Sequence, residues 1–263
     1  MSAPGMLGSW SGECPRLCVS FLHTALITPS ASPQRFRILR EVFVKNVLRS
    51  WIHALDVHGA ETSNIKTAEL LKAQAERRVA LILCSQFCGL VEYRPAVRLL
   101  SVLLLNDIYP QVWAVGGLPD TDEEAGDFPV TSTLNAIVSA GEGTIPDLTP
   151  NRLRESLLSM LAGSHSFDEV ILSSTLLSVM LESESIDDAA LELLKVLPTS
   201  NHLSSSSSST SPYEDACASF LTKAVAGGVH SCSTETRVCA IESVSSFGLV
   251  LLERIIRHSW TEL

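Results

Sequence analysis

Apolar residues recur every three or four positions along most of this chain, which is the spacing of one face of an α-helix. The segment from Thr234 to His258 shows the pattern most clearly and predicts a long amphipathic helix. The stripe expected to face the core carries Gly248 and consists of Val238, Ile241, Val244, Leu251, Leu252 and Ile255. Polar residues are expected to fill the other side, namely Arg237, Glu242, Ser243, Ser246, Glu253 and Arg254.

Two apolar helices joined by a short acidic turn are predicted between Ser166 and Pro198. Ser166 and Glu169 have the spacing of a capping box, in which hydroxyl and carboxylate each accept from the other residue's backbone N–H. Ser185 and Asp188 repeat that spacing with a shorter acid, and Pro198 ends the second helix. The expected buried residues are Phe167, Val170, Ile171, Leu177 and Leu181 in the first helix, and Ile186, Ala190, Leu193, Leu194 and Leu197 in the second.

Capping residues, prolines and apolar spacing predict the remaining helices. These cover residues 33–58, 65–88, 95–106, 131–139, 151–161 and 212–226, with Ser-Pro or Thr-Pro at the start of three of them. No alternating strand pattern is longer than three or four residues. We therefore predict an all-α protein, either an irregular α-α helical array or a HEAT/armadillo-like solenoid with degenerate repeats.

Changes in composition divide the chain. Residues 1–31 are rich in Gly, Ser and Pro and predict a loosely ordered N-terminal tail, and residues 116–130 (GGLPDTDEEAGDFPV) predict an acidic linker. Between them lies a mildly basic helical module, residues 32–115. A second helical module covers residues 131–263 and contains a Ser-rich insert at 199–211.

The amount and distribution of charge limit the classes of function. Hydrophobic residues make up 46% of the 263 residues and charged residues 18%, which is too apolar for a disordered protein. Residues 31–110 hold 11 Lys+Arg against 7 Asp+Glu, whereas residues 111–200 hold 3 against 15, and the whole chain has a formal net charge of −10. Because the chain as a whole repels phosphate, we expect no nucleic acid partner.

The seven cysteines show no framework of a small disulfide-rich domain, so a reducing compartment is expected. Cys84 and Cys88 lie four residues apart on a predicted helix, but their apolar neighbours favour buried thiols over metal ligands. A zinc site from Cys14, Cys18 and His23 lacks a fourth ligand nearby. The remaining thiols of interest, Cys232 and Cys239, flank the start of the last helix without an identifiable base, so core or capping positions are expected.

No other motif supports catalysis. The sequence lacks H-E-x-x-H and the G-x-S-x-G elbow, and Gly141-Glu142-Gly143-Thr144 is an incomplete phosphate loop without a following Lys. The acids Asp187-Asp188 suit a helix start, and Asp122-Glu123-Glu124 suit a solvated loop. Ser204 to Thr210 is a candidate modification segment. We predict no catalytic residue, no metal ligand, no cofactor and no small-molecule substrate.

The sequence also lacks a clear membrane or targeting segment. The longest apolar run, Val79 to Val91, is shorter than the roughly 18 residues that a membrane span requires. Residues 17–27 loosely imitate a signal peptide after Arg16, but His23 and Thr24 interrupt the apolar run. A tail or edge helix in a cytoplasmic protein is the expectation.

Residues 167–198, which contain LSSTLLSVMLESESIDDAALELLKVLP, and the helix around residues 236–255 resemble the FPL-domain family of endosomal and autophagy proteins, which includes the C-type lectin domain family sixteen member A proteins. That family has similar leucine-rich helices ending in Leu-Pro, a variable low-complexity insert and an Arg-containing amphipathic helix. Its N-terminal FPL domain is not recognisable in this chain, and no functional residue carries over. The resemblance implies a cytosolic scaffold that associates peripherally with endosomal or lysosomal membranes.

Three functions remain as hypotheses. The first is a non-enzymatic helical scaffold in endosomal and lysosomal vesicle trafficking and autophagy, which binds protein partners through apolar or acidic helix faces. The second is a HEAT/armadillo-like adaptor of protein–protein contacts in an unrelated pathway. The third is a helical thiol enzyme, with Cys239 as its first candidate nucleophile.

Overall fold

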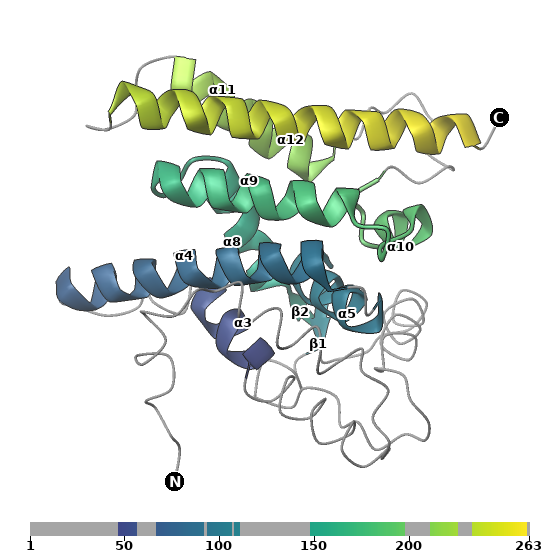
Figure 1. The fold of residues 1–263 in the computed structure, drawn as a ribbon, viewed down its shortest axis with the longest axis horizontal. Coiled ribbons are helices and arrows are strands. Elements are labelled where there is room, and N and C mark those ends of the chain that lie inside the picture. Colours follow the sequence, from purple (N-terminus) through teal and green to yellow (C-terminus); the bar gives the residue numbers. More distant parts are fainter. Residues whose placement is uncertain are drawn as a thin grey trace, which may run out of the picture.

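The computed structural model of this protein describes residues 47–56, 67–91, 94–106, 108–110, 148–197, 211–225 and 233–261. Three long helices form its main stack (Figure 1), namely α4 (Thr67–Leu90), α9 (Phe167–Glu182) and α12 (Thr234–Thr261). The middle layer is α9, which packs against α4 on one side and α12 on the other. The predicted all-α class is confirmed, whereas a solenoid or repeat arrangement is not confirmed.

Shorter elements surround this stack. The helices are α3 (Arg49–Leu55), α5 (Arg94–Leu105), α8 (Arg152–Leu161), α10 (Asp188–Leu193) and α11 (Pro212–Val225). Two three-residue strands, β1 (Ile108–Pro110) and β2 (Leu148–Pro150), pair antiparallel with Ile108 opposite Pro150. This pair brings the chain after α5 next to the start of α8.

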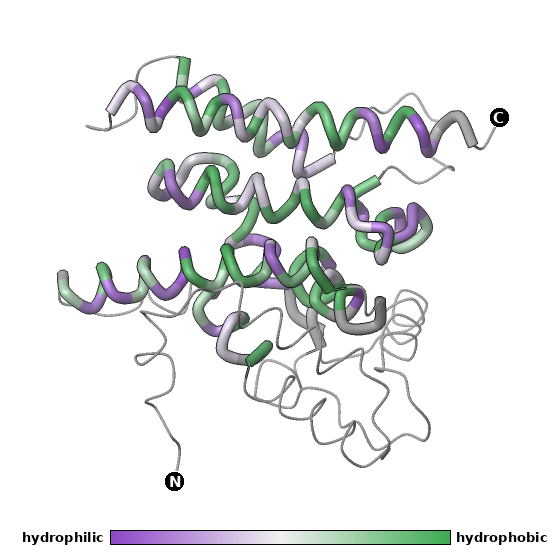
Figure 2. The backbone as a smooth tube through the Cα atoms, in the orientation of Figure 1, coloured by the Kyte–Doolittle hydropathy of each residue, from purple (hydrophilic) through white to green (hydrophobic). Residues whose placement is uncertain are grey.

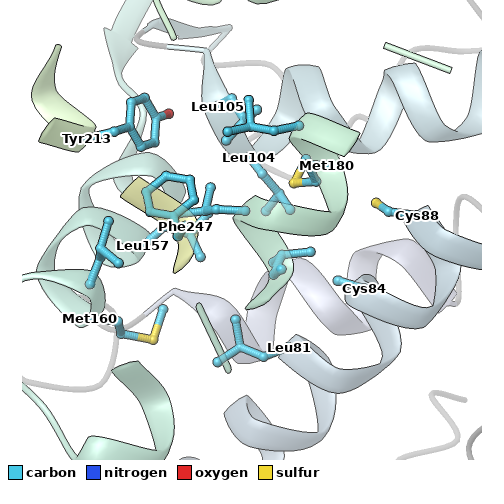
Figure 3. Close-up of a cluster of buried hydrophobic side chains, with 14 of the residues drawn as sticks. Leu81, Cys84, Cys88, Leu104, Leu105, Leu157, Met160, Met180, Tyr213 and Phe247 are labelled. Carbon is cyan, nitrogen blue, oxygen red and sulfur yellow. The ribbon is translucent and has the colours of Figure 1, made fainter. Parts of the chain in front are cut away.

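Buried hydrophobic side chains form one cluster that includes helices from both predicted modules. Trp51 on α3 and Phe87 on α4 pack edge to face with their ring centroids 5.7 Å apart. Phe167 on α9 and Phe220 on α11 do the same with their centroids 6.1 Å apart. Figure 3 shows labelled members of the cluster from α4, α5, α8, α9, α11 and α12 converging on the same region. The helices before and after residues 116–130 therefore share a core.

The middle helix, α9, is buried on more than one side because layers cover it from both directions. Its buried apolar residues are Phe167, Val170, Leu176, Leu177, Met180 and Leu181. Burying one large aliphatic side chain contributes about 1.5–3 kcal/mol, so this helix is a major source of stability. The hydroxyls of buried Ser173 and Ser174 donate to the carbonyl of Val170, at 3.1 and 2.8 Å, which satisfies them within the helix.

The predicted caps of the α9–α10 hairpin are half correct. The capping box is present, since Ser166 Oγ accepts from the Glu169 N–H and the Glu169 carboxylate accepts from the Ser166 N–H. The second predicted cap, Ser185, is wrong because this residue is buried in the turn. Asp187 caps α10 instead, with its Oδ1 accepting from the Ala190 N–H at 2.8 Å.

The start of α8 also differs from the prediction. Thr149-Pro150 belongs to β2, and the N-cap is Asn151, whose Oδ1 accepts from the Leu153 N–H at 3.0 Å. The amide of buried Asn151 donates to the carbonyls of Leu103 and Asn106, at 2.9 and 2.7 Å. One side chain therefore caps α8 and satisfies carbonyls at the end of α5.

The predicted inner stripe of α12 is partly wrong. Val244 and Leu251 are buried as expected, but Ala240 and Phe247 complete the inner face. Val238 and Leu252 are instead 45% and 49% exposed. The apolar pattern of this helix covers more than one face, and only the face toward α9 and α11 is buried.

Two short helices end with left-handed backbone. Gly163 follows α8 with φ of 73°, and its N–H donates to the Met160 carbonyl. Lys195 follows α10 with φ of 55°, a conformation that favours glycine. The predictions for residues 1–46, 116–130 and 131–139, for Pro198 and for the Ser-rich insert up to residue 210 concern parts outside the described residues.

Candidate interaction site

A buried ion pair joins α4 to α9. The guanidinium of Arg77 donates to Glu169 Oε1 at 2.8 Å, and the two side chains are 5% and 0% exposed. The other carboxylate oxygen, Oε2, accepts from the Ser166 N–H and hydroxyl at 3.2 and 3.1 Å. The carboxylate that caps α9 is therefore also the buried counter-ion of Arg77. These hydrogen bonds and the ion pair compensate the cost of removing the carboxylate from water.

The next residue on α4 holds the same end of α9. Arg78 Nη1 lies 2.9 Å from Asp168 Oδ2, and Nη2 donates to Ser166 Oγ at 3.2 Å. We call Arg77, Arg78, Ser166, Asp168 and Glu169 the N-terminal clamp. Two cations at the start of α9 are balanced by two acids there, and these acids also suit the positive end of the helix dipole.

A second cluster holds the turn between α9 and α10. Arg98 from α5 donates to the Ser185 carbonyl at 3.0 Å and to Asp187 Oδ2 at 2.6 Å. Arg254 from α12 donates to the carbonyls of Leu181 and Ile186, at 2.9 and 3.0 Å, and to Asp188 Oδ1. We call Arg98, Arg254, Asp187 and Asp188 the turn clamp. Its arginines satisfy the Leu181 carbonyl at the end of α9 and the Ser185 and Ile186 carbonyls of the turn.

The acids predicted to serve only as helix-start charges therefore have a second role. Asp187 and Asp188 favour the start of α10, as expected, and they also bind arginines from helices distant in sequence. Arg254, which the pattern assigned to the polar side of α12, instead reaches toward the hairpin. These contacts account for the acids of both clamps by helix capping and ion pairing, whereas Arg77 Nε and Arg78 Nε are buried without a hydrogen-bond partner among the described residues.

The described cysteines behave as core thiols with one exception. Cys84, Cys88 and Cys217 are buried, whereas Cys239 is exposed. Burial raises the pKa of the Cys84 thiol well above its usual value, and it raises the pKa values of Cys88 and Cys217 to about 12. Such thiols remain protonated near neutral pH and are poor nucleophiles and metal ligands. Within the described ranges, no group of three or more His, Cys, Asp or Glu side chains has a metal-binding arrangement.

Of the remaining candidates from the sequence, the structure describes Ser211. Ser211 is at the start of α11, where its hydroxyl accepts from the Tyr213 N–H at 3.4 Å and its own N–H donates to Glu214 at 2.9 Å. The candidates that fall outside the described residues are Cys14, Cys18, His23, Ser32, Asp122 to Glu124, Gly141 to Thr144, Ser204 to Thr210 and Cys232.

The feature that sequence reasoning missed is a set of exposed aliphatic side chains on the two outer helices of the stack. On α12 these are Val238, Leu249, Leu252 and Ile256, and on α4 they are Leu70, Leu71, Val79 and Leu90. Leu249 is 67% exposed and Leu71 is 61% exposed. Figure 2 shows hydrophobic and hydrophilic residues interleaved along α12 and the first half of α4. The four on α12 lie on one side of that helix, and large aliphatic groups clustered in this way are typical of sites that bind other proteins.

In the part of the chain that the structure describes, no helix is long and apolar enough to cross a membrane. The fold and the clamps define a layered all-α protein whose arginines tie consecutive layers together. Comparison with protein-family models, curated proteins and solved structures finds no match to this chain.

Proposed function

We propose that this protein is a non-enzymatic helical scaffold that binds other proteins through the outer helices of its stack. The observation that carries the proposal is the placement of exposed aliphatic side chains. Eight of the nine exposed large hydrophobic residues among the described positions lie on α4 and α12, and the ninth is Val225 at the end of α11. The middle helix, α9, contributes none.

The clamps support this proposal because they make the layers a rigid support. An exposed face binds more tightly when its residues are held in place before binding, since less conformational entropy is lost. The N-terminal clamp ties α4 to α9, and Arg254 of the turn clamp ties α12 to the α9–α10 hairpin. Both outer helices are thereby anchored to the middle layer.

The cellular setting that we propose is endosomal or lysosomal vesicle trafficking and autophagy, with peripheral membrane association. Its support is the resemblance of residues 167–198 and 236–255 to the FPL-domain family. An adaptor role in an unrelated pathway is the alternative with the same binding chemistry. Tagged full-length protein imaged with endosomal and lysosomal markers separates the two, since diffuse cytosolic signal at native expression would contradict the trafficking setting.

Affinity purification tests the scaffold function itself. Tagged wild-type chain is compared with Leu249→Ser/Leu252→Ser on α12 and with Leu70→Ser/Leu71→Ser on α4, and circular dichroism checks that each variant is folded. We expect a reproducible set of co-purifying proteins, part of which is lost with one of the paired variants. Ala218→Ser, at an exposed position of α11, is a control that introduces a serine and leaves the aliphatic residues of α4 and α12 in place. Identical protein sets from all four chains would contradict the proposal.

A further inference from the structure

The outward face of α12 has two chemically different halves. Residues seven apart lie almost above one another on a helix, and Glu235, Glu242, Leu249 and Ile256 form such a row. All four are exposed. Along this row the first half is acidic and the second half is aliphatic, with exposed Leu252 beside it. The face also carries exposed Val238 in its first half, and the Glu253–Arg257 ion pair in its second half.

Within the described part of the chain, no ion pair uses the acids in the first half. Among the described ion pairs of α12, Arg254 binds Asp188, Arg257 binds Glu253 at 2.7 Å, and His258 lies 3.9 Å from Glu192. None of these pairs includes Glu235 or Glu242. Their charges are therefore available to a partner. Both lie beyond the inner face that packs on α9 and α11.

Gly248 adds a second observation one helical turn before Leu252, at the edge of the outward face. A Cβ atom at this position would meet nothing within 4 Å, so no packing inside the chain requires a glycine there. Glycine in a helix interior is less stable than alanine by about 1 kcal/mol. A glycine at this site is explained if the backbone of another helix approaches α12 closely.

We infer that the outward face of α12 binds an amphipathic helix of a partner protein that has one aliphatic half and one Lys/Arg-rich half. The aliphatic half lies against Leu249, Leu252 and Ile256, and the basic half lies against Glu235 and Glu242. This inference rests on the proposed scaffold function and specifies the chemistry of its partner.

The face is poorly suited to a second copy of itself. In a parallel pair of α12 helices, Glu235 and Glu242 would face the same acids of the other copy. In an antiparallel pair centred on the row, the acidic half of one copy would face Leu249 and Ile256 of the other. Either arrangement leaves carboxylates opposite like charges or apolar groups, which disfavours association.

The test uses two labelled synthetic helical peptides of about 20 residues, a length that spans most of α12. Both carry the same leucine stripe in one half, and the other half contains lysines in the first peptide and glutamates in the second. Fluorescence anisotropy with the full chain is expected to show at least about tenfold tighter binding of the lysine peptide, equivalent to about 1.4 kcal/mol. Equal affinities, or no binding of either peptide, would overturn the inference.

Charge reversal locates the site. Glu242→Lys is expected to abolish the preference for the lysine peptide. Glu76→Lys makes the same charge change at an exposed position of α4 and is expected to leave the preference intact. Leu249→Ser/Leu252→Ser weakens both peptides, and Gly248→Leu weakens both without lowering the unfolding midpoint. A preference that survives Glu242→Lys would overturn the inference. So would sedimentation of the wild-type chain as a dimer that Leu249→Ser/Leu252→Ser dissociates, because a second copy would then occupy the face.

The two proposals fail separately. Co-purifying proteins that depend on Leu249 and Leu252, together with no peptide preference, would refute the basic partner and leave the scaffold function standing. A peptide preference that Glu242→Lys removes, together with no specific co-purifying protein, would refute the scaffold function and leave the binding specificity of the face established.

Discussion

Removing Arg77 is expected to destabilise the chain far more than removing an exposed cation from the same helix. In Arg77→Met the aliphatic part of the side chain is largely replaced, but the fully buried carboxylate of Glu169 loses its counter-ion. The two side chains are 5% and 0% exposed and their charged atoms are 2.8 Å apart, so water does not screen the pair. Breaking such a pair from one side costs about 3–5 kcal/mol.

The matched control is Lys72→Met, five residues earlier on α4. Lys72 and Glu76 are 3.7 Å apart with side chains 76% and 45% exposed, and an exposed pair at this spacing is worth about 0.3–0.5 kcal/mol. Equilibrium urea unfolding of the wild-type chain and both variants, followed by circular dichroism at 222 nm, measures the difference. For a domain whose total stability is about 5–15 kcal/mol, the loss in Arg77→Met is a large fraction.

The double variant Arg77→Met/Glu169→Met separates the charge pair from packing. Removing both charges leaves no buried ion without a partner, so the double variant is expected to be more stable than Arg77→Met alone. It still lacks the Glu169 half of the capping box, so full recovery is not expected. The reasoning is refuted if Arg77→Met costs no more than Lys72→Met, or if the double variant is the least stable of the set.

Gly163→Ala is expected to lower the unfolding midpoint, because a Cβ there would lie 2.7 Å from the ring of Phe220 and the backbone has φ of 73°; an unchanged midpoint would contradict this. Lys195→Gly is expected to raise stability by about 1 kcal/mol in urea unfolding, since glycine adopts the φ of 55° without strain, and a loss of stability would argue against it. Timed iodoacetamide labelling at pH 8 with peptide mapping is expected to modify Cys239 before the buried thiols; equal rates would refute their burial. Burial raises the pKa of Cys84 and brings those of Cys88 and Cys217 to about 12 against an ordinary 9.0, so the unfolded chain loses these protons at lower pH than the folded chain does. The free energy of unfolding is therefore expected to be unaffected by these thiols below pH 9 and to fall as the pH rises toward 12, and a thermal unfolding midpoint that stays constant over this range would contradict it.

Local features were predictable because they depend on neighbours in sequence. The capping box at Ser166 and Glu169 and the start of α11 at Ser211-Pro212 require residues three positions apart or fewer. The bounds of α4 and α5 also follow closely from apolar spacing and a proline. A cap is harder to predict where two capping residues lie close together, as Ser185 and Asp187 do. Only the fold decides which of them is buried and which caps the helix.

Pairings between distant residues were not predictable from one sequence. Arg77 and Glu169 are 92 residues apart, and nothing in their local patterns distinguishes a buried pair from two solvated charges. Helical periodicity likewise shows that a face is apolar without showing what covers it. On α12 the predicted stripe combined Val244, which is buried, with Val238 and Leu252, which are exposed, because the helix has apolar groups on more than one face.

The clamps change the interpretation of the uneven charge. Three arginines from the basic first half, Arg77, Arg78 and Arg98, bind acids of the acidic second half, so part of the asymmetry is matched inside the fold. The buried Arg77–Glu169 pair is poorly screened by salt, whereas Glu235 and Glu242 are exposed to ions in the solvent. Raising the salt from 50 to about 500 mM shortens the Debye length to below about 10 Å, so it should weaken binding of the lysine peptide at α12 while the wild-type chain keeps its unfolding midpoint. If salt lowers both together, the internal pairs are solvated surface contacts, and the rigid support argued for the outer helices is lost with them.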